Sequence, residues 1–276
     1  MKKFENIILA SDIDGTFVCQ YSFVHPRNYE RVKYFVDNGG HFLLSSGRNS
    51  KDICVAGDIL RLVNTPCVLC NGAMLYDIEN DVIENPVYIE TEPFVEALRY
   101  IDKTYPDVGF RASYEGGFVI RETDKFIINE LERYDTLRFA TFASLDDFKK
   151  YKMFKAVIRA PRERIAEVER DVVPKYEGAF TFTRSSDQIL EIMPKGINKS
   201  YQLKFLKDKL SHDKEMTLWC VGDYDNDIDM LRFADIAACP DNATDAVKAI
   251  CSVHLCNCKY GAVGELVDVI EKNLNK

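Results

Sequence analysis

Residues 7–16, with the sequence IILASDIDGT, run from an apolar segment into two carboxylates, Asp12 and Asp14, and then into a Gly-Thr break. A continuous apolar run rich in β-forming residues predicts a buried strand of a parallel sheet. Ligands of open α/β sheets bind beyond the carboxyl ends of the strands. The sequence therefore predicts that the chemistry of this protein takes place around Asp12 and Asp14.

Length and composition predict a globular protein of one large or two unequal domains. The chain has 276 residues, with 46% hydrophobic and 29% charged residues, which are ordinary globular values. A formal net charge of −8 argues against a nucleic-acid partner. Charge at Lys2 and Lys3 argues against a secretory signal, and no apolar stretch is long enough to span a membrane. We expect a cytoplasmic enzyme with no membrane partner.

Closely spaced cysteines occur only as isolated pairs, and the total number of cysteines, nine, is odd. Cys67 and Cys70 make a CxxC within an expected strand, where alternation points the two side chains to opposite faces. Cys256 and Cys258 lie close to His254 without a second well-spaced pair. We expect reduced, mostly buried thiols rather than zinc ligands or a redox pair. Three further cysteines lie in apolar patterns and are expected in the core: Cys54, Cys220 and Cys251.

Strands and helices alternate along the first part of the chain, which predicts a parallel sheet with right-handed crossovers. The expected elements after the first strand are a helix that opens at Pro26 and ends at Gly39, a strand over 41–45, a helix around 53–60, a strand over 67–70 and a hairpin over 73–83.

A second α/β layer interrupts this pattern. Its expected elements are a helix from Thr91, strands over 108–114, 118–121 and 154–159, a helix over 162–173, and strands over 179–183 and 188–192. We expect an inserted domain of about 100 residues, an ordinary domain size. The predicted division is residues 1–86 for the first part of the core, 87–187 for the insertion and 188–276 for the second part of the core.

The core resumes with a helix over 199–210 and a buried strand over 216–221. That strand ends in residues 222–227, GDYDND, so a second strand delivers carboxylates at its carboxyl end. In a parallel sheet both ends lie at the same edge. Strands over 236–239 and 252–255 and a helix over 264–274 complete the expected core.

Asp12, Asp14 and Asp223, at neighbouring strand ends, repel one another unless a cation lies between them. Oxygen ligands and a small hard ion indicate Mg²⁺. The alternative for each residue is a structural role, since an Asp-x-Asp pair also occurs by chance.

Three further residues suit an anionic ligand. Ser46 offers a hydroxyl at another strand end, Gly47 allows close backbone approach to an anion, and Lys199 adds a compact positive charge. A strand-end serine also caps helices, and a helical lysine is usually solvated. Together with a carboxylate nucleophile and a metal, these groups are typical of phosphoryl transfer through an aspartyl-phosphate.

Four segments resemble the motifs of the haloacid dehalogenase superfamily: DIDGT at 12–16, SGR at 46–48, GINK at 196–199 and GDYDND at 222–227. The pattern is most similar to the Cof-like phosphatases with a class IIB cap, and it covers essentially the whole chain. The resemblance implies an α/β fold with a Rossmann-like parallel core and an inserted α/β cap that selects the substrate. It also implies a Mg²⁺-dependent phosphatase acting on small phosphorylated metabolites such as sugar phosphates.

The resemblance also implies residue roles. Asp12 is the expected nucleophile and a metal ligand, and Asp14 is the expected general acid and base, with its backbone carbonyl on the metal. Asp223 completes the protein's metal ligands, and Asn226 and Asp227 lie in the adjoining shell. The expected catalytic residues are Asp12, Asp14, Ser46 and Lys199. The expected substrate contacts are Ser46, Gly47, Arg48, Lys199, Asn226 and, in the inserted domain, Arg111.

The sequence departs from the family pattern in several places. Ser46 replaces the commoner Thr and keeps the hydroxyl, and Ser200 replaces the usual Gly after Lys199. Lys195 lies only four residues before Lys199 and is the alternative candidate for the lysine of the third motif. Asn242, in a segment that differs from the usual one, is a candidate for a contact with the loop near the site.

Several alternatives stay open from the sequence. Arg111, Tyr114, Glu115 and the turn at Gly116 and Gly117 either face the site or form an ordinary strand and hairpin loop. A phosphomannomutase-like phosphomutase needs the same two aspartates. A non-catalytic regulatory protein on this fold is the second rival, although every motif position carries a chemically competent side chain.

Overall fold

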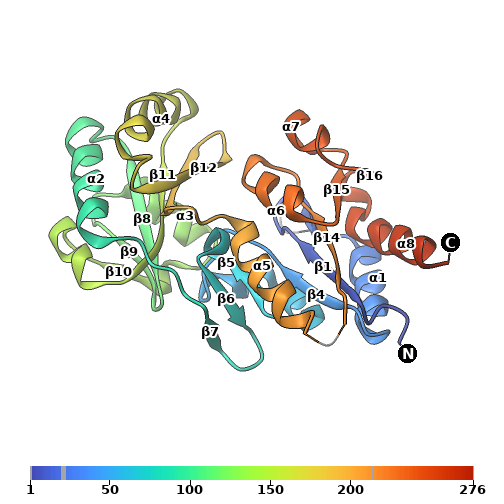
Figure 1. The fold of residues 1–276 in the computed structure, drawn as a ribbon. Helices are drawn as coiled ribbons and strands as arrows, with labels where there is room; N and C mark the ends of the chain where they lie inside the picture. The colour runs from blue at the N-terminus through green and yellow to red at the C-terminus, as the bar shows by residue number, and fades with distance from the viewer. Residues whose placement is uncertain (1, 20–22, 213, 276) are drawn as a thin grey trace. The chain divides into compact units, whose positions relative to one another are not determined.

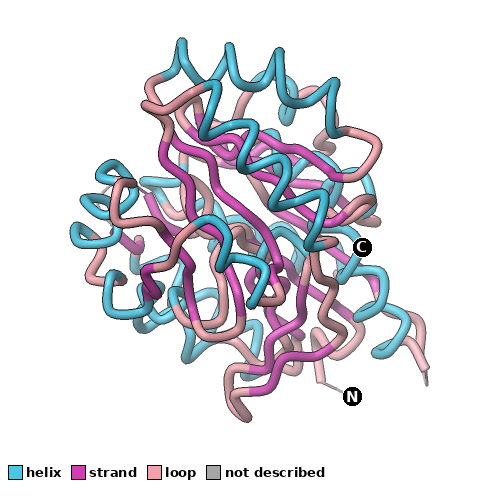
Figure 2. Tube along the Cα trace, turned by 90° about the vertical axis from the view of Figure 1, so that its left-hand side faces the viewer, coloured by secondary structure: helices cyan, strands magenta, loops and turns pink. Residues whose placement is uncertain are grey.

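The computed structural model describes residues 2–19, 23–212 and 214–275, and the chain forms two compact units. We call the first the core unit: it contains Met1–Ser46, Ala56–Glu84 and Lys199–Lys276. We call the second the inserted unit: it contains Gly47–Val55 and Asn85–Asn198. Figures 1 and 2 show the helices and strands of both units. In the described part of the chain, no helix combines the length and the apolar character needed to cross a membrane.

A five-stranded parallel sheet forms the centre of the core unit, with the order β16-β15-β14-β1-β4. Its strands are β1 (Ile7–Ser11), β4 (His41–Leu44), β14 (Thr217–Val221), β15 (Ile236–Pro240) and β16 (Val253–Leu255). Ala10 of β1 lies in register with both Cys220 and Leu43, so β1 runs between β14 and β4. All five residues of β1 are buried, as its apolar run predicted.

Helices α5 and α6 cover one face of this sheet. Leu203 and Leu206 of α5 and Met230 of α6 pack in one cluster with Ile8 and Ala10 of β1. The helices of the core unit are α1 (Pro26–Asp37), α5 (Lys199–Leu210), α6 (Ile228–Phe233), α7 (Asp245–Lys248) and α8 (Ala262–Leu274), with short 3₁₀ segments η3 (Cys70–Gly72), η6 (Asp225–Asp227) and η7 (Cys258–Tyr260).

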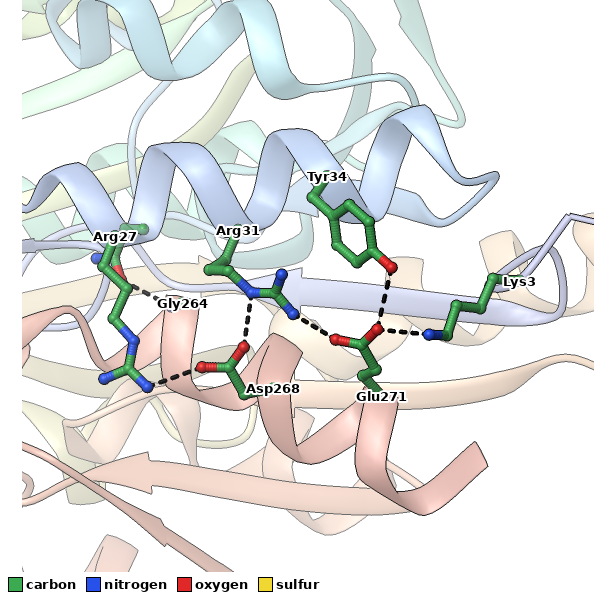
Figure 3. Close-up of polar contacts among 8 residues, drawn as sticks. Lys3, Arg27, Arg31, Tyr34, Gly264, Asp268 and Glu271 are labelled. Carbon is green, nitrogen blue, oxygen red and sulfur yellow. Dashed lines mark hydrogen bonds and ion pairs between the residues drawn. The ribbon is translucent and has the colours of Figure 1, made fainter. Parts of the chain in front are cut away.

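Helices α1 and α8 lie side by side and are joined by charged side chains (Figure 3). Asp268 accepts from Arg27 at 2.8 Å and from Arg31 at 2.6 Å. Glu271 pairs with Arg31 at 2.6 Å, accepts from the Tyr34 hydroxyl at 3.0 Å and also pairs with Lys3 (Figure 3). This seam, defined by these residues, connects the first helix of the chain to the last.

One prediction about the chain between β4 and the inserted unit needs correction. The strand expected over 67–70 is confirmed as β5 (Cys67–Leu69), which joins the end of β4 through a parallel bridge between Ser45 and Val68. The expected hairpin follows as β6 (Met74–Asp77) and β7 (Val82–Glu84), which extend β5 in an antiparallel sheet with the order β5-β6-β7. The expected helix around 53–60 is a 3₁₀ segment, η2 (Asp52–Leu62), that breaks at Gly57, where φ is 61°. A positive φ ends regular helix geometry. A small hairpin, β2 (Val18–Cys19) and β3 (Phe23–Val24), follows β1.

A six-stranded sheet with the order β10-β9-β8-β11-β13-β12 forms the inserted unit. Its strands are β8 (Gly109–Tyr114), β9 (Gly117–Ile120), β10 (Ala140–Phe142), β11 (Met153–Arg159), β12 (Phe180–Ser186) and β13 (Ile189–Pro194). Helices α2 (Thr91–Thr104) and α4 (Arg162–Tyr176) pack on one face: Leu98, Ile101 and Val168 share a cluster with Ala112 and Ile158. The other elements are α3 (Lys125–Arg133), η4 (Leu137–Phe139) and η5 (Leu145–Lys150).

The inserted unit is larger than the expected segment 87–187. That limit falls between β12 and β13, and β13 pairs with both β11 and β12, so the unit extends to Asn198. Helix α3 and strand β10 were not predicted from the sequence. Ile127 and Leu131 of α3 are buried at i,i+4 spacing, a signal that was present in the sequence.

One of the three cysteines expected in the core is not buried. Cys220 and Cys251 lie in the core, whereas Cys54 is exposed. Cys54 lies in the 3₁₀ segment beside buried Ile53, so its own side chain points to solvent.

Candidate active site

The carboxyl end of β1 places Asp12 at the edge of the core sheet. The backbone N–H of Asp12 donates to the carbonyl oxygen of Val221 at 2.9 Å, which continues the pairing of β1 with β14. Because β1, β14 and β4 are parallel, Asp12, Asp223 and Ser46 all follow strands that end at this edge. The side chain of Asp12 is buried among these strand ends.

Lys199, the first residue of α5, joins two carboxylates. Its Nζ atom lies 2.6 Å from Oδ1 of Asp12 and 2.6 Å from Oδ1 of Asp227, and its side chain is fully buried. Burial by itself lowers the pKa of Lys199, but the two carboxylates outweigh burial and raise that pKa above its ordinary value. Lys195 is exposed and donates to the carbonyl of Glu177 in the inserted unit. Lys199 is therefore the lysine at Asp12, and Lys195 is not.

Asp227 holds the loop that follows β14. Its Oδ1 atom accepts a hydrogen bond from Nζ of Lys199. Its Oδ2 atom accepts from the backbone N–H groups of Asp223 at 2.9 Å and Tyr224 at 3.2 Å. Both oxygens of this buried carboxylate are thus engaged by the protein. Asp227 orients Lys199 and the Asp223 backbone at the same time.

The turn after Asp14 holds the side chain of Asp223. Thr16 donates its hydroxyl to Oδ1 of Asp223 at 2.7 Å. Gly15 has a φ of 87°, and a Cβ atom there would lie 2.3 Å from Oδ2 of Asp223, so only glycine fits. Asn242 donates to the Gly15 carbonyl at 2.8 Å, which confirms its expected contact with this loop. No role was predicted for Thr16 from the sequence, although it stands in the DIDGT motif.

Three carboxylates converge tightly enough to hold a cation. Asp12, Asp223 and Asp227 each offer an oxygen, and these oxygens lie within 4.8 Å of one another. Burial, and then repulsion from Asp227, raises the pKa of Asp12 well above its ordinary value and that of Asp223 to about 7. One lysine among three carboxylates leaves excess negative charge. Hard oxygen donors of this kind fit Mg²⁺.

The side chain of Asp14 lies outside this trio. It is exposed, while its neighbour Ile13 is buried. The expected metal contact of Asp14 uses its backbone carbonyl, so its side chain stays available for proton transfer. Both roles of Asp14 remain predictions.

The remaining predicted residues divide between the two units. Ser46 is buried in the core unit, where its N–H donates to the Val68 carbonyl at 2.8 Å. Asn226 is half-buried and precedes Asp227 in η6. The inserted unit contains the three others: Gly47, Arg48 and Arg111.

Comparison with known proteins identifies the family of this chain. The sequence profile of the haloacid dehalogenase-like hydrolases matches residues 9–266. The chain belongs to this family. The 5-amino-6-(5-phospho-D-ribitylamino)uracil phosphatase YitU of Bacillus subtilis is 23% identical over 252 residues, which cover 88% of this chain and 89% of that protein. The chain is a phosphoric monoester hydrolase of the haloacid dehalogenase (HAD) type.

Solved structures share the fold across both units. A haloacid dehalogenase-like hydrolase from Bacteroides thetaiotaomicron has a TM-score of 0.80 at 21% identity, covering 95% of this chain and 98% of its own. The HAD subclass IIB sugar phosphatase BT4131 has a TM-score of 0.79 at 18% identity, with the same coverage. The predicted α/β fold, a parallel core sheet with an inserted α/β cap, is confirmed.

Proposed function

We propose that this HAD phosphatase hydrolyses small phosphorylated metabolites, sugar phosphates among them, through an aspartyl-phosphate formed on Asp12. One observation carries the proposal: fully buried Lys199 lies 2.6 Å from the Asp12 carboxylate, beside Asp223 and Asp227. A cation at that position offsets charge between the nucleophile and a phosphoryl group. It also stabilises the ionised carboxylate, which is the form that attacks phosphorus.

In the first step, a carboxylate oxygen of Asp12 attacks phosphorus, and the bond from phosphorus to the leaving alkoxide breaks. The exposed carboxyl group of Asp14 donates a proton to that alkoxide, which departs as an alcohol. A general acid must avoid ligation through its own carboxylate, and the Asp14 side chain lies apart from the carboxylate trio.

In the second step, water attacks phosphorus and transfers a proton to Asp14. The bond between phosphorus and Asp12 breaks, which releases inorganic phosphate and restores both aspartates. Ser46, buried at the end of β4, is proposed to bind the transferring phosphoryl group, with Asn226 nearby.

The residues that would hold Mg²⁺ are Asp12, Asp223 and the backbone carbonyl of Asp14. When bound, Mg²⁺ neutralises charge on the phosphoryl group and favours the ionised form of Asp12. Asp227 is proposed to act beside this set, because its two oxygens already bind Lys199 and two backbone N–H groups.

Two relatives support the substrate class. One is named as a phosphatase of a ribitylamino-uracil phosphate and the other as a sugar phosphatase. Both names describe small phosphate esters that carry a polyhydroxylated chain or ring. We propose substrates of this size for the present chain.

The test measures phosphate release from a panel of small phosphate esters, with Mg²⁺ and with excess chelator. We expect Mg²⁺-dependent hydrolysis by the natural protein and none by Asp12→Asn. A matched control, Asp208→Asn, changes an exposed aspartate of α5 and should leave turnover unchanged. Substantial turnover by Asp12→Asn would overturn the covalent mechanism.

Product analysis in the same assay separates the rival functions. A phosphomutase would return the phosphoryl group to the sugar and release little free phosphate. A non-catalytic protein would release none from any member of the panel.

A further inference from the structure

Ser45 is a buried serine that directly follows β4 and precedes Ser46. Its side chain is fully buried, and its Oγ atom has no hydrogen-bond partner among the described residues. Most buried polar atoms of folded proteins have a hydrogen-bond partner, and a buried hydroxyl without one costs free energy. A function in ligand binding would explain why the chain keeps a hydroxyl at this position.

Strand register places Ser45 next to Asp12. The backbone N–H of Ser45 donates to the Ser11 carbonyl at 2.8 Å, which continues the parallel pairing of β4 with β1. Leu44 lies in register with Ser11, so the next pair along the two strands is Ser45 and Asp12. Neighbouring strands lie about 4.8 Å apart. The proposed nucleophile and this hydroxyl therefore stand on adjacent strand ends of the core unit, after β1 and β4 (Figure 1).

Ser45 points to the face of the sheet that α5 covers. Successive side chains of a strand point to opposite faces, so Ser45 shares a face with Leu43. Leu43 packs in one cluster with apolar side chains of α5. Val68 of β5, which forms a parallel bridge with Ser45, belongs to the same cluster. Two neighbours of Ser45, one on its own strand and one on the adjacent strand, thus indicate the same direction for its side chain.

Asp12 lies on that face as well. Ala10, on β1 just before Asp12, belongs to the cluster under α5. The Asp12 carboxylate accepts from Nζ of Lys199, the first residue of α5, at 2.6 Å. Lys199 is fully buried, and Asp12 is only 8% exposed. A phosphoryl group on Asp12 is therefore held in buried surroundings, where a hydrogen bond from a fixed donor is stronger than in water.

We propose that Ser45 is a second hydroxyl of the phosphoryl site, in addition to Ser46, and that it donates a hydrogen bond to a phosphoryl oxygen while that group is bound to Asp12. This inference rests on the proposed function and adds one residue to it. The strand fixes the hydroxyl before the ligand arrives, as a preorganised donor requires. The hydrogen bond stabilises negative charge on the phosphoryl group, so it favours the aspartyl-phosphate and the transition states on either side of it.

Two other roles for this hydroxyl predict different results. A hydroxyl that serves the fold would stabilise the free protein, so its removal would destabilise that protein. A hydroxyl with no role in the site would leave ligand affinity unchanged when it is removed. A donor for the phosphoryl group costs stability in the free protein and contributes only when the ligand is bound.

The experiment compares Ser45→Ala with the natural protein in two measurements. Calorimetric titration of orthovanadate, a phosphate analogue, into the Mg²⁺-loaded protein measures ligand affinity, and thermal melts without Mg²⁺ or vanadate measure stability. We expect vanadate to bind at least about tenfold more weakly to Ser45→Ala, the loss of one hydrogen bond to a charged group. The melting temperature should be unchanged or higher, since the substitution removes an unpartnered buried hydroxyl. Ser45→Cys keeps a similar shape with a weaker donor and should give an intermediate affinity.

Two other serines serve as controls. Ser11→Ala removes a buried hydroxyl that has a partner, the Asp12 carbonyl at 2.7 Å, and should lower the melting temperature. Ser252→Ala changes an exposed serine of the core unit and should leave vanadate affinity unchanged. Ser45→Ala itself should bind Mg²⁺ as the natural protein does, because it removes none of the proposed metal ligands.

The outcomes separate this inference from the proposed function. An unchanged vanadate affinity in Ser45→Ala overturns the inference and leaves the phosphatase intact. A loss of stability as large as that of Ser11→Ala also overturns it, because the hydroxyl then serves the fold. If the natural protein binds no vanadate and releases no phosphate from p-nitrophenyl phosphate, the proposed function itself fails.

Discussion

Nζ of Lys199 and Oδ1 of Asp12 lie 2.6 Å apart although 187 residues separate them in the chain. The same Nζ atom lies 2.6 Å from Asp227, whose other oxygen accepts from the backbone of the loop after β14. One ammonium group thus links Asp12, at the end of β1, to the carboxylate loop that follows β14. Removing that group should therefore disturb both strand ends at once.

Lys199→Met should lower kcat by about 10²- to 10³-fold, the usual effect of removing one preorganised charge or donor from a reacting centre. Lys195→Met is the matched control. Because Lys195 is exposed, it should change kcat by no more than about twofold, as surface substitutions do. Steady-state kinetics on one ester, with thermal melts for folding, make the comparison. Equal losses in the two variants would contradict the assignment of Lys199.

Asp14→Asn should bind Mg²⁺ with nearly the natural affinity and turn over about 10²- to 10⁴-fold more slowly, the range lost with a general acid-base group. The side chain of Asp14 lies outside the carboxylate trio, so its amide analogue leaves that trio intact. Calorimetric titration with Mg²⁺ and kcat measurements test the two halves separately. Loss of Mg²⁺ binding in this variant would show that the side chain ligates the metal.

Gly15→Ala should weaken Mg²⁺ binding and lower the free energy of unfolding by more than about 1 kcal/mol, the typical cost of a non-glycine residue at positive φ. The added Cβ would lie 2.3 Å from Oδ2 of Asp223. Gly196→Ala separates strain from clash, since Gly196 has a φ of 78° and no described atom lies within 4 Å of the place a Cβ would take. It should lose stability without losing Mg²⁺ affinity. Identical Mg²⁺ affinities in both variants would refute the predicted clash.

The seam between α1 and α8 predicts a pH-dependent stability. Hydrogen bonds from Lys3, Arg31 and Tyr34 lower the pKa of Glu271 to about 2, below its ordinary value of about 4.3. Its stabilising contribution is therefore present above pH 4.3 and is lost as the pH falls toward 2. The free energy of unfolding of Glu271→Gln should differ from that of the natural protein at pH 5, and the gap should shrink at pH 3.

Urea denaturation at pH 5, 4 and 3 measures this gap. Glu122→Gln, a change at an exposed glutamate of the inserted unit, serves as the control and should show no such trend. A gap for Glu271→Gln that stays constant over this range would refute the prediction.

Local patterns in the sequence determined much of the fold. The apolar run before Asp12 predicted β1, the helical spacing after Lys199 predicted α5 with the same limits, and GDYDND marked the end of β14. These signals work because helix and strand periodicities depend on residues close together in the chain. The helical spacing around 53–60 predicted a helix that does not form, because Gly57 interrupts it and the segment is 3₁₀.

Only the tertiary structure decided which side chains meet. It placed Lys199 rather than Lys195 on Asp12 and added Asp227 to the carboxylate trio. The sequence by itself determined that Asp12, Asp14 and Asp223 stand at strand ends and hence which reaction to expect. The structure decided their partners, because contacts between residues far apart in the chain depend on strand order and register, which no local pattern encodes.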